Sequence, residues 1–193
     1  MATVLMVCSG NQCRSPAAAL LLERLLGPSV EVTSAGISAR EGSSIPRPMR
    51  RVLREDGLDG RAHRARRLTR EVAEQADLII PMARAHGHYI ALLSPTAGAR
   101  TVPLGQLAAI ARQAPPPAGA SVEERIAEVV DVAARGSRAS SASAALDVPD
   151  TFGGSVSQYR ETYSLIRGMV AAVAGWLAPA PPRSPQATIS DSH

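Results

Sequence analysis

The feature that most constrains the fold is a short apolar run followed at once by turn-forming residues and then by a helix-forming stretch. Residues 3–7 are almost all apolar, as in a strand that is buried on both faces. Residues 9–11 favour a turn, and residues 17–26 favour a helix that ends at Gly27, with Pro16 expected as its first residue. We therefore expect a central parallel strand, a loop and a helix in that order.

The same alternation continues along the chain. Further strands are predicted at 30–34, 77–81 and 100–104, and further helices at 49–55, 65–75, 83–93 and 155–177. Strands that alternate with helices on this scale are typical of an α/β fold. We expect a three-layer fold with a four-stranded parallel sheet, helices on both faces, and a phosphate-binding loop between the first strand and the first helix.

Length and composition favour one domain. The chain has 193 residues and is 45% hydrophobic, which is enough for one ordinary core. We expect this domain to span 1–177, with an extra Ala-, Pro- and Ser-rich helical insertion at 113–145. Ser121 and Glu124 form a predicted capping box at the start of the insertion's helix. Residues 178–193 are rich in Pro and Ser, so we expect a disordered tail.

Charge, cysteine content and hydropathy restrict the partners. The net charge is +4, but the arginines of 47–70 are interleaved with acids and aromatics make up only 3% of the chain, so we expect no nucleic acid partner. A basic rim could still steer anionic substrates. The two cysteines, at positions 8 and 13, do not have the spacing of zinc ligands and are too close together to link distant parts of the chain by a disulfide. No apolar run approaches the roughly 18 residues that span a bilayer. These features predict a cytoplasmic protein without membrane insertion, metal or cofactor.

Cys8 and Arg14 lie six positions apart, inside the predicted loop that joins the buried strand to the start of the helix. Backbone N–H groups of such a loop, the helix dipole and a guanidinium fork together suit a phosphate dianion. The same positive field favours the thiolate form of Cys8, which is the nucleophilic form of cysteine. This arrangement predicts attack of Cys8 on phosphorus and a phosphocysteine intermediate.

The segment from Cys8 to Pro16 reads Cys-x-Gly-Asn-x-Cys-Arg-Ser-Pro, which closely resembles the signature of the low-molecular-weight protein-tyrosine-phosphatase family. Residues 34–36, 63–69 and 77–82 are similar to further segments of that family. The resemblance covers about 1–110 and 146–177, and the 113–145 stretch is longer than the family pattern. It implies phosphorylated protein substrates, an active site that holds phosphate or another oxyanion, and a loop that needs no metal.

The resemblance also implies roles for individual residues. Cys8 would be the nucleophile, and Arg14 would bind the phosphate and its transition-state charge. Ser15 would hydrogen-bond the thiolate. The expected loop-supporting residues are Asn11, Ser34 and His63, although spacing alone would make His63 a surface histidine. The expected substrate-contacting residues are Ser9, Gly10, Asn11, Gln12, Cys13, Ser15 and Phe152.

Asp150 resembles the general acid on the family's Asp-Pro-aromatic loop, where a departing oxygen needs a proton. Phe152 and two glycines follow it at family spacing, but Thr151 stands where Pro is usual. The missing Pro affects the orientation of the loop, and not which residue is the acid. Asp147 is the nearby alternative for the acid, and either carboxylate could instead cap a turn before the last helix.

The substrate is less constrained than the chemistry. Family members selective for phosphotyrosine line the pocket mouth with aromatic side chains, whereas residues 40–48 contain none and only Phe152 could form a wall. Gln12 stands where tyrosine phosphatases look apolar and related protein-arginine phosphatases look Thr-like. We predict a phosphatase for phosphorylated protein residues, phosphotyrosine first, with phosphoarginine as the alternative.

Two other classes are less favoured. Arsenate reduction resembles a thiol relay that needs further cysteines, and none follows Cys13. A non-catalytic phosphate-binding module would not need Cys8, Arg14 and Asp150 together. A reversible Cys8–Cys13 disulfide under oxidation is a separate hypothesis.

Overall fold

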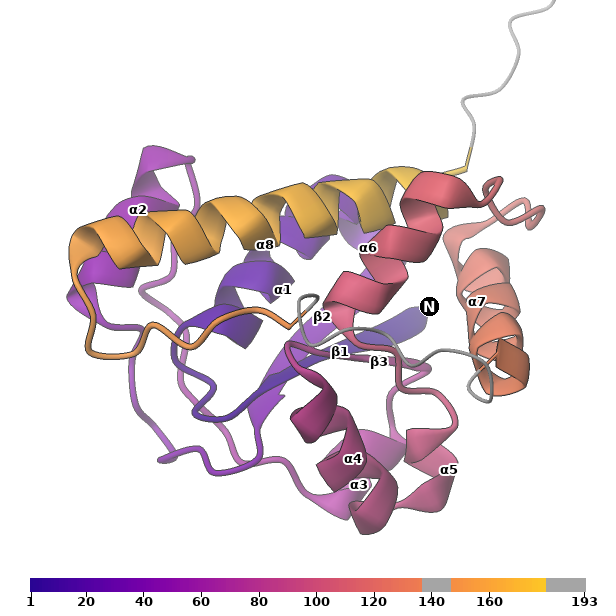
Figure 1. The fold of residues 1–193 in the computed structure, drawn as a ribbon, viewed down its shortest axis with the longest axis horizontal. Coiled ribbons are helices and arrows are strands. Elements are labelled where there is room, and N and C mark those ends of the chain that lie inside the picture. The colour runs from indigo at the N-terminus through magenta and orange to yellow at the C-terminus, as the bar shows by residue number, and fades with distance from the viewer. Residues whose placement is uncertain (137–146, 180–193) are drawn as a thin grey trace, which may run out of the picture.

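Three parallel strands form the centre of the molecule in a computed structural model that describes residues 1–136 and 147–179 (Figure 1). The strands β1 (Ala2–Cys8), β2 (Val30–Gly36) and β3 (Leu78–Pro81) lie in the order β2-β1-β3. Leu5 of β1 pairs with Thr33 on one side and with Ile79 on the other. β1 is therefore the central strand, as its apolar run predicts.

The predicted fourth strand at 100–104 is wrong. Only Thr101 pairs there, in an isolated parallel bridge to Ile79. The backbone N–H of Val102 still donates to the Ile79 carbonyl at 2.9 Å. Pro103 has no N–H to continue the ladder, and a helix begins at Leu104. Among the described residues the sheet thus has three strands, not four.

Helices cover both faces of the sheet, as expected. On one side lie α1 (Arg14–Leu26), α2 (Arg47–Glu55), α6 (Leu104–Gln113) and α8 (Val156–Leu177), and on the other lie α3 (Arg70–Glu74), α4 (Arg84–Leu93) and α5 (Pro95–Gly98) (Figure 1). A short 3-10 turn, η1 (Gly27–Ser29), follows α1. The layers confirm the α/β class.

The side chains of β1 alternate between two cores. Val4, Met6 and Cys8 pack into the cluster that contains α1 and α8, whereas Leu5 and Val7 pack into the cluster on the α4 side. Each of these side chains is at most 2% exposed. Burial of such an apolar side chain contributes about 1.5–3 kcal/mol, so β1 is held firmly from both faces. Its last residue, Cys8, is fixed in place with it.

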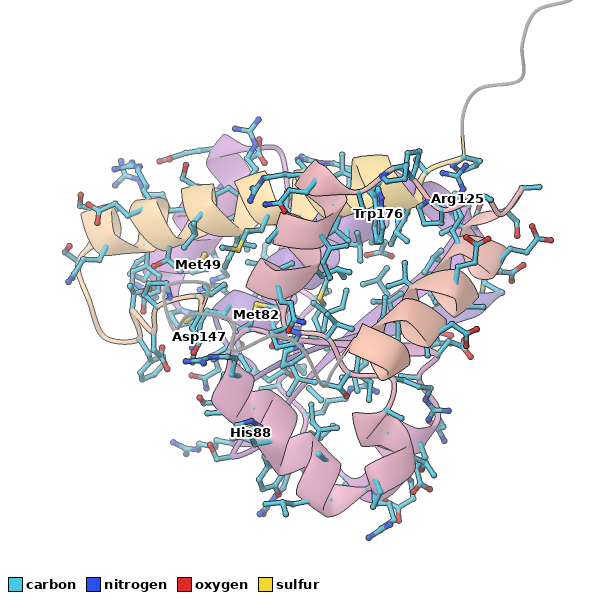
Figure 2. All side chains as sticks on the ribbon, turned by 45° about the vertical axis from the view of Figure 1, so that its right-hand side comes forward. Met49, Met82, His88, Arg125, Asp147 and Trp176 are labelled. Carbon is cyan, nitrogen blue, oxygen red and sulfur yellow. The ribbon has the colours of Figure 1, made fainter. Side chains whose placement is uncertain are left out.

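The helix predicted inside the insertion is α7 (Val122–Gly136). Ile126 is buried in the core that contains α8, and the Arg125 guanidinium donates to the Ala178 carbonyl at 2.7 Å (Figure 2). The chain's amino group pairs with Glu123, which places α7 beside the first residues of β1. Cys8 is at the other end of that strand. α7 therefore packs away from the loop of residues 9–13.

Two other predictions concern residues outside the described ranges. The Ala/Ser/Arg-rich part of the insertion at 137–145 and almost all of the predicted 178–193 tail lie there. In the described ranges, no helix is both long and apolar enough to cross a bilayer.

Candidate active site

The loop of residues 9–13 joins the end of β1 to the start of α1. The helix begins at Arg14, two residues before the predicted start at Pro16, so Arg14 and Ser15 belong to its first turn. The backbone N–H groups of this turn have no partners within the helix and are available to an anion. Cys8 and Arg14 are 2% and 5% exposed, respectively.

Two groups lie within hydrogen-bonding distance of the Cys8 sulfur. The backbone N–H of Asn11 donates to Cys8 Sγ at 3.2 Å, and Ser15 Oγ lies 3.1 Å from it. Ser15 Oγ accepts a hydrogen bond from Asn11 Nδ2 at 3.0 Å, and its own proton can be donated to the sulfur or to the Ala35 carbonyl, which lies 3.4 Å away. Both groups can therefore donate to a thiolate at this position.

Asn11 holds the loop in a backbone conformation that few residues adopt. Its φ of 51° lies in the left-handed region, and its side chain is fully buried. Asn11 Nδ2 donates to Ser34 Oγ at 2.9 Å, and Asn11 Oδ1 accepts the Arg66 backbone N–H at 2.9 Å. The Asn11 carbonyl accepts from His63 Nε2 at 2.7 Å. Burial lowers the pKa of His63, which favours the neutral ring with its proton on Nε2.

The Arg14 guanidinium connects the loop to a segment far along the chain. Its Nη2 donates to Ser9 Oγ at 3.2 Å, and its Nη1 donates to the Val148 carbonyl at 3.2 Å. Nη2 also forms an ion pair with Asp150. The Arg14 side chain is 6% exposed and that of Asp150 is 48% exposed. The buried cation is thus paired with a carboxylate that solvent can reach.

The two candidate acids lie in different surroundings. Asp147 Oδ1 accepts the backbone N–H of Arg84 at 3.0 Å and also pairs with the Arg84 side chain at 3.7 Å, at the start of α4 (Figure 2). Asp150 instead lies beside Arg14 and lines the same hollow as Cys8. Asp147 does not line that hollow.

The hollow has a volume of about 190 Å³. It is lined by Cys8, Ser9, Gly10, Gln12, Cys13, Arg14, Ser38, Asp150 and Phe152. Asn11, Ser15, Ser34 and His63 are absent from the lining; Ser15, Ser34 and His63 hydrogen-bond Asn11 and so support the loop. Phe152 is 63% exposed and is the aromatic residue of the lining. Most residues proposed from the sequence therefore meet at one place.

His86 is a residue of this site that the sequence analysis missed. Its Nε2 lies 3.0 Å from Ser9 Oγ, and Ser9 Oγ already accepts from Arg14, so the Ser9 proton points to the ring. The His86 side chain is buried, its Nδ1 has no hydrogen-bond partner, and burial followed by the Arg14 charge lowers its pKa to about 4. The ring is therefore neutral at pH 7.

Tyr159 was also missed. Its hydroxyl accepts the backbone N–H of Gly153 at 3.2 Å and hydrogen-bonds Cys13, so it connects the Asp150 segment to the loop. Burial raises the pKa of Cys13 to about 12, which keeps it a thiol. Both cysteines are free. His86 lies in α4 and Tyr159 lies in α8, both far along the chain from the loop of residues 9–13. No sequence motif around either residue therefore predicts that it reaches this site.

No group of three or more His, Cys, Asp and Glu side chains within 1–136 and 147–179 could hold a metal ion. The chemistry that these residues support is nucleophilic and acid–base. Cys8 is the nucleophile candidate, Arg14 the anion-binding cation, and Asp150 the exposed carboxyl group beside both.

We compared the sequence with models of known protein families. Residues 3–115, more than half of the chain, match the model of the low molecular weight phosphotyrosine protein phosphatases. The chain belongs to this family. The match confirms the resemblance that the motif from Cys8 to Pro16 indicates.

Individual proteins and solved structures are also similar to this phosphatase. A Geobacillus stearothermophilus protein named protein-arginine-phosphatase is 42% identical over 103 residues, which is 53% of this chain and 69% of the relative. A Ralstonia solanacearum protein named probable low molecular weight protein-tyrosine-phosphatase EpsP is 39% identical over 105 residues, covering 54% and 72%. The structure of Vibrio vulnificus Wzb in complex with benzylphosphonate covers 90% of this chain and 97% of its own, at 26% identity and a TM-score of 0.68.

Proposed function

We propose that this family member is a cysteine-dependent protein phosphatase that works through a phosphocysteine intermediate at Cys8. The observation that carries the proposal is that Cys8, Arg14 and Asp150 line one hollow, although Asp150 lies 136 positions from Arg14 in the chain. The benzylphosphonate complex of the Vibrio relative supports an oxyanion in the corresponding site.

In the first step the Cys8 thiolate attacks phosphorus, the S–P bond forms and the bond to the leaving oxygen breaks. Ser15 and the Asn11 N–H hold the sulfur, and the Arg14 guanidinium neutralises the phosphoryl charge. A phosphate bound to Arg14 competes with Asp150 for the same cation, which frees the Asp150 carboxyl group to protonate the leaving oxygen.

In the second step water attacks phosphorus, its proton passes to the Asp150 carboxylate, and the S–P bond breaks to return the thiolate and inorganic phosphate. Protonation and deprotonation of one residue balance over the cycle. The exposure of Asp150 gives it contact with both the leaving group and the water.

The phosphoryl donor that we propose first is phosphotyrosine, because the chain belongs to the phosphotyrosine phosphatase family and Phe152 stands exposed in the lining, available to an aryl ring. Phosphoarginine is the second candidate. It is supported by the 42%-identical relative named protein-arginine-phosphatase, and by a lining without a second aromatic residue to grip a phenol ring.

The catalytic assignment is tested with para-nitrophenyl phosphate and a substrate with a poorer leaving group. We expect Cys8→Ser to abolish turnover, and Asp150→Ala to lower kcat on the poorer substrate by about 100-fold or more. Asp147→Ala is the matched control and should change kcat less than Asp150→Ala. Equal rates for wild type and Cys8→Ser would overturn the nucleophile, and a larger loss in Asp147→Ala would move the acid.

The substrate is tested by rates on phosphotyrosine and phosphoarginine peptides of one sequence. We expect a higher kcat/KM for phosphotyrosine, and the reverse order would establish the second candidate. We further propose that 1–177 is one catalytic domain with 113–145 as an insertion, and that the protein works in the cytoplasm, where a free thiolate persists. Subcellular fractionation tests the location.

A further inference from the structure

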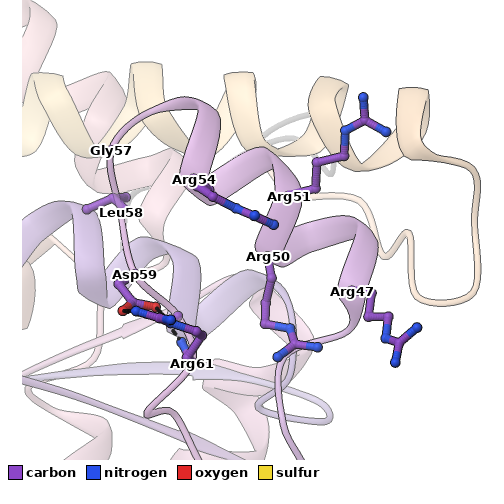
Figure 3. Close-up of a pocket in the computed structure, with 9 residues that line it drawn as sticks. Arg47, Arg50, Arg51, Arg54, Gly57, Leu58, Asp59 and Arg61 are labelled. Atoms are coloured by element: carbon purple, nitrogen blue, oxygen red, sulfur yellow. Dashed lines mark hydrogen bonds and ion pairs between the residues drawn. The ribbon is translucent and has the colours of Figure 1, made fainter.

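A second and larger hollow lies beside α2, apart from the hollow at Cys8. Its volume is about 700 Å³. Figure 3 shows the side chains that line it. Its lining consists of Arg47, Arg50, Arg51, Arg54, Gly57, Leu58, Asp59, Gly60 and Arg61. Five of these nine residues are arginines and only Asp59 is acidic. We call this surface the basic hollow.

The four arginines of α2 lie on one helical face, because their spacing is i, i+3, i+4 and i+7. Like charges at these spacings repel, and Arg47 stands in the first turn, where the helix dipole disfavours a cation and no acidic residue offsets it. Folding alone therefore does not explain this pattern. Departures of this kind from local rules concentrate at functional surfaces.

Carboxylates of the protein neutralise only some of the arginines in the basic hollow. Asp59 accepts hydrogen bonds from the Arg61 Nε and Nη2 at 2.8–3.1 Å, and so is already clamped by that side chain (Figure 3). Arg51 pairs with Glu55 at 3.4 Å. Among the described residues, no carboxylate lies within ion-pair distance of Arg47 or Arg50. These two guanidinium groups keep their donors for an external anion.

The basic hollow is connected to the back of the candidate active site. An adjoining hollow shares Asp59 with it, and its further lining includes Glu23, His63, Arg64 and Arg66. His63 Nε2 contacts the Asn11 carbonyl in the loop of residues 9–13 at 2.7 Å. The adjoining hollow thus leads from the basic hollow to Ser34 and His63, which support the phosphate-binding loop.

We propose that the basic hollow binds an acidic segment of the phosphoprotein substrate, outside the catalytic hollow. This rests on the proposed function, which makes the substrate a protein chain. Guanidinium groups bind carboxylates in a bidentate manner, and successive arginines along α2 suit a segment with several carboxylates. The lining contains no aromatic side chain on which a nucleic acid base could stack.

The test compares Arg50→Gln/Arg54→Gln with a matched control, Arg70→Gln/Arg112→Gln, which removes the same charge from α3 and α6 (Figure 1). Arg50 and Arg54 lie outside the catalytic machinery, so para-nitrophenyl phosphate turnover should stay at the wild-type rate and report correct folding. Binding is measured by fluorescence anisotropy at physiological salt. The probes are a labelled Glu/Asp peptide, its Gln/Asn counterpart and an oligothymidylate of equal charge.

We expect the acidic peptide to bind wild type, and its affinity to fall about tenfold in Arg50→Gln/Arg54→Gln but less than about twofold in the control. The kcat/KM of a phosphopeptide with an acidic flank should fall in parallel, relative to one with a neutral flank. Equal losses in both variants, no binding to wild type, or tighter binding of the oligothymidylate would overturn the basic hollow as an acidic-peptide site. Absence of para-nitrophenyl phosphate turnover in wild type would instead overturn the proposed function.

Discussion

Asn11 illustrates how one residue can set the geometry of the loop of residues 9–13. Its backbone lies in the left-handed region, and in that conformation its buried side-chain amide forms hydrogen bonds with Ser15, Ser34 and the Arg66 backbone at the same time. We expect Asn11→Ala to lower the free energy of unfolding by about 3 kcal/mol, through unsatisfied partners and backbone strain. Chemical denaturation measures the change.

Asn11→Gly separates the two causes. Glycine adopts a positive φ without strain but lacks the amide, so Asn11→Gly should be about 1 kcal/mol more stable than Asn11→Ala and equally poor in turnover. If glycine restored the wild-type rate, the hydrogen bonds of the Asn11 side chain would not be what shapes the loop.

His86 makes stability depend on pH. Burial lowers the pKa of His86 from its ordinary 6.5 to about 4 in the fold, so between these pH values the unfolded chain binds a proton that the buried ring does not. The free energy of unfolding should therefore fall with pH from 6.5 to 4, by about 3 kcal/mol from this group. Arg14, Asp150 and Asp147 are the charged groups that act on the ring.

His86→Gln should flatten that pH dependence, measured as the free energy of unfolding at several pH values. His88→Gln is the matched control, because His88 lies two residues further along α4 with an exposed side chain (Figure 2). An unchanged slope in His86→Gln would mean that His86 binds its proton as readily in the folded protein as in the unfolded chain, which would contradict the lowered pKa.

Among single residues, those in one local motif could be predicted and those that arrive from elsewhere could not. Cys8, Arg14 and Ser15 are set by a strand, a turn and a helix start within a few positions, so sequence spacing suffices to bring them together. His86 reaches Ser9 across 77 positions, and its role depends on where α4 begins beside the loop. Only the packed fold contains that information.

At the scale of elements, α7 stabilises the molecule at a distance from the chemistry. Ile126 is buried beside α8, and α7 lies at the end of β1 opposite Cys8. Ile126→Ala should lower the free energy of unfolding by about 3 kcal/mol and leave kcat on para-nitrophenyl phosphate within about twofold of wild type.

Ala127→Ser, at an exposed position of the same helix, should change neither quantity by a measurable amount. A large fall of kcat in Ile126→Ala, measured well below its melting temperature, would contradict the placement of α7 away from the active site.

The elements also show where sequence patterns stop being informative. β1 has a clear apolar run, and α1 and α8 are long helix-forming stretches; all three lie within a few residues of their predicted bounds. Residues 100–104 are apolar enough for a strand, but Pro103 ends the pairing and α6 follows. α6 was not predicted from periodicity; its Leu107 and Ala108 are buried in the core that also contains residues of α8.

At the scale of the whole molecule, the parallel sheet brings three separate segments to the carboxyl end of β1. The loop after β1, the start of α4 after β3, and the segment of Val148 and Asp150 meet there through Arg14 and Ser9. Open α/β sheets place ligand sites at this end of their strands. The fold thus brings Asp150, which lies 136 positions from Arg14 in the chain, to the hollow that the local motif of Cys8 and Arg14 lines.

The most direct measurement of the central claim is rapid-quench trapping of the phosphoenzyme with para-nitrophenyl phosphate, followed by peptide mass spectrometry. Asp150→Ala should accumulate the intermediate, because the second step loses its base. We predict one phosphoryl group on the peptide that contains Cys8 and none in Cys8→Ser. A phosphoryl group on another residue, or turnover that persists in Cys8→Ser, would contradict the account.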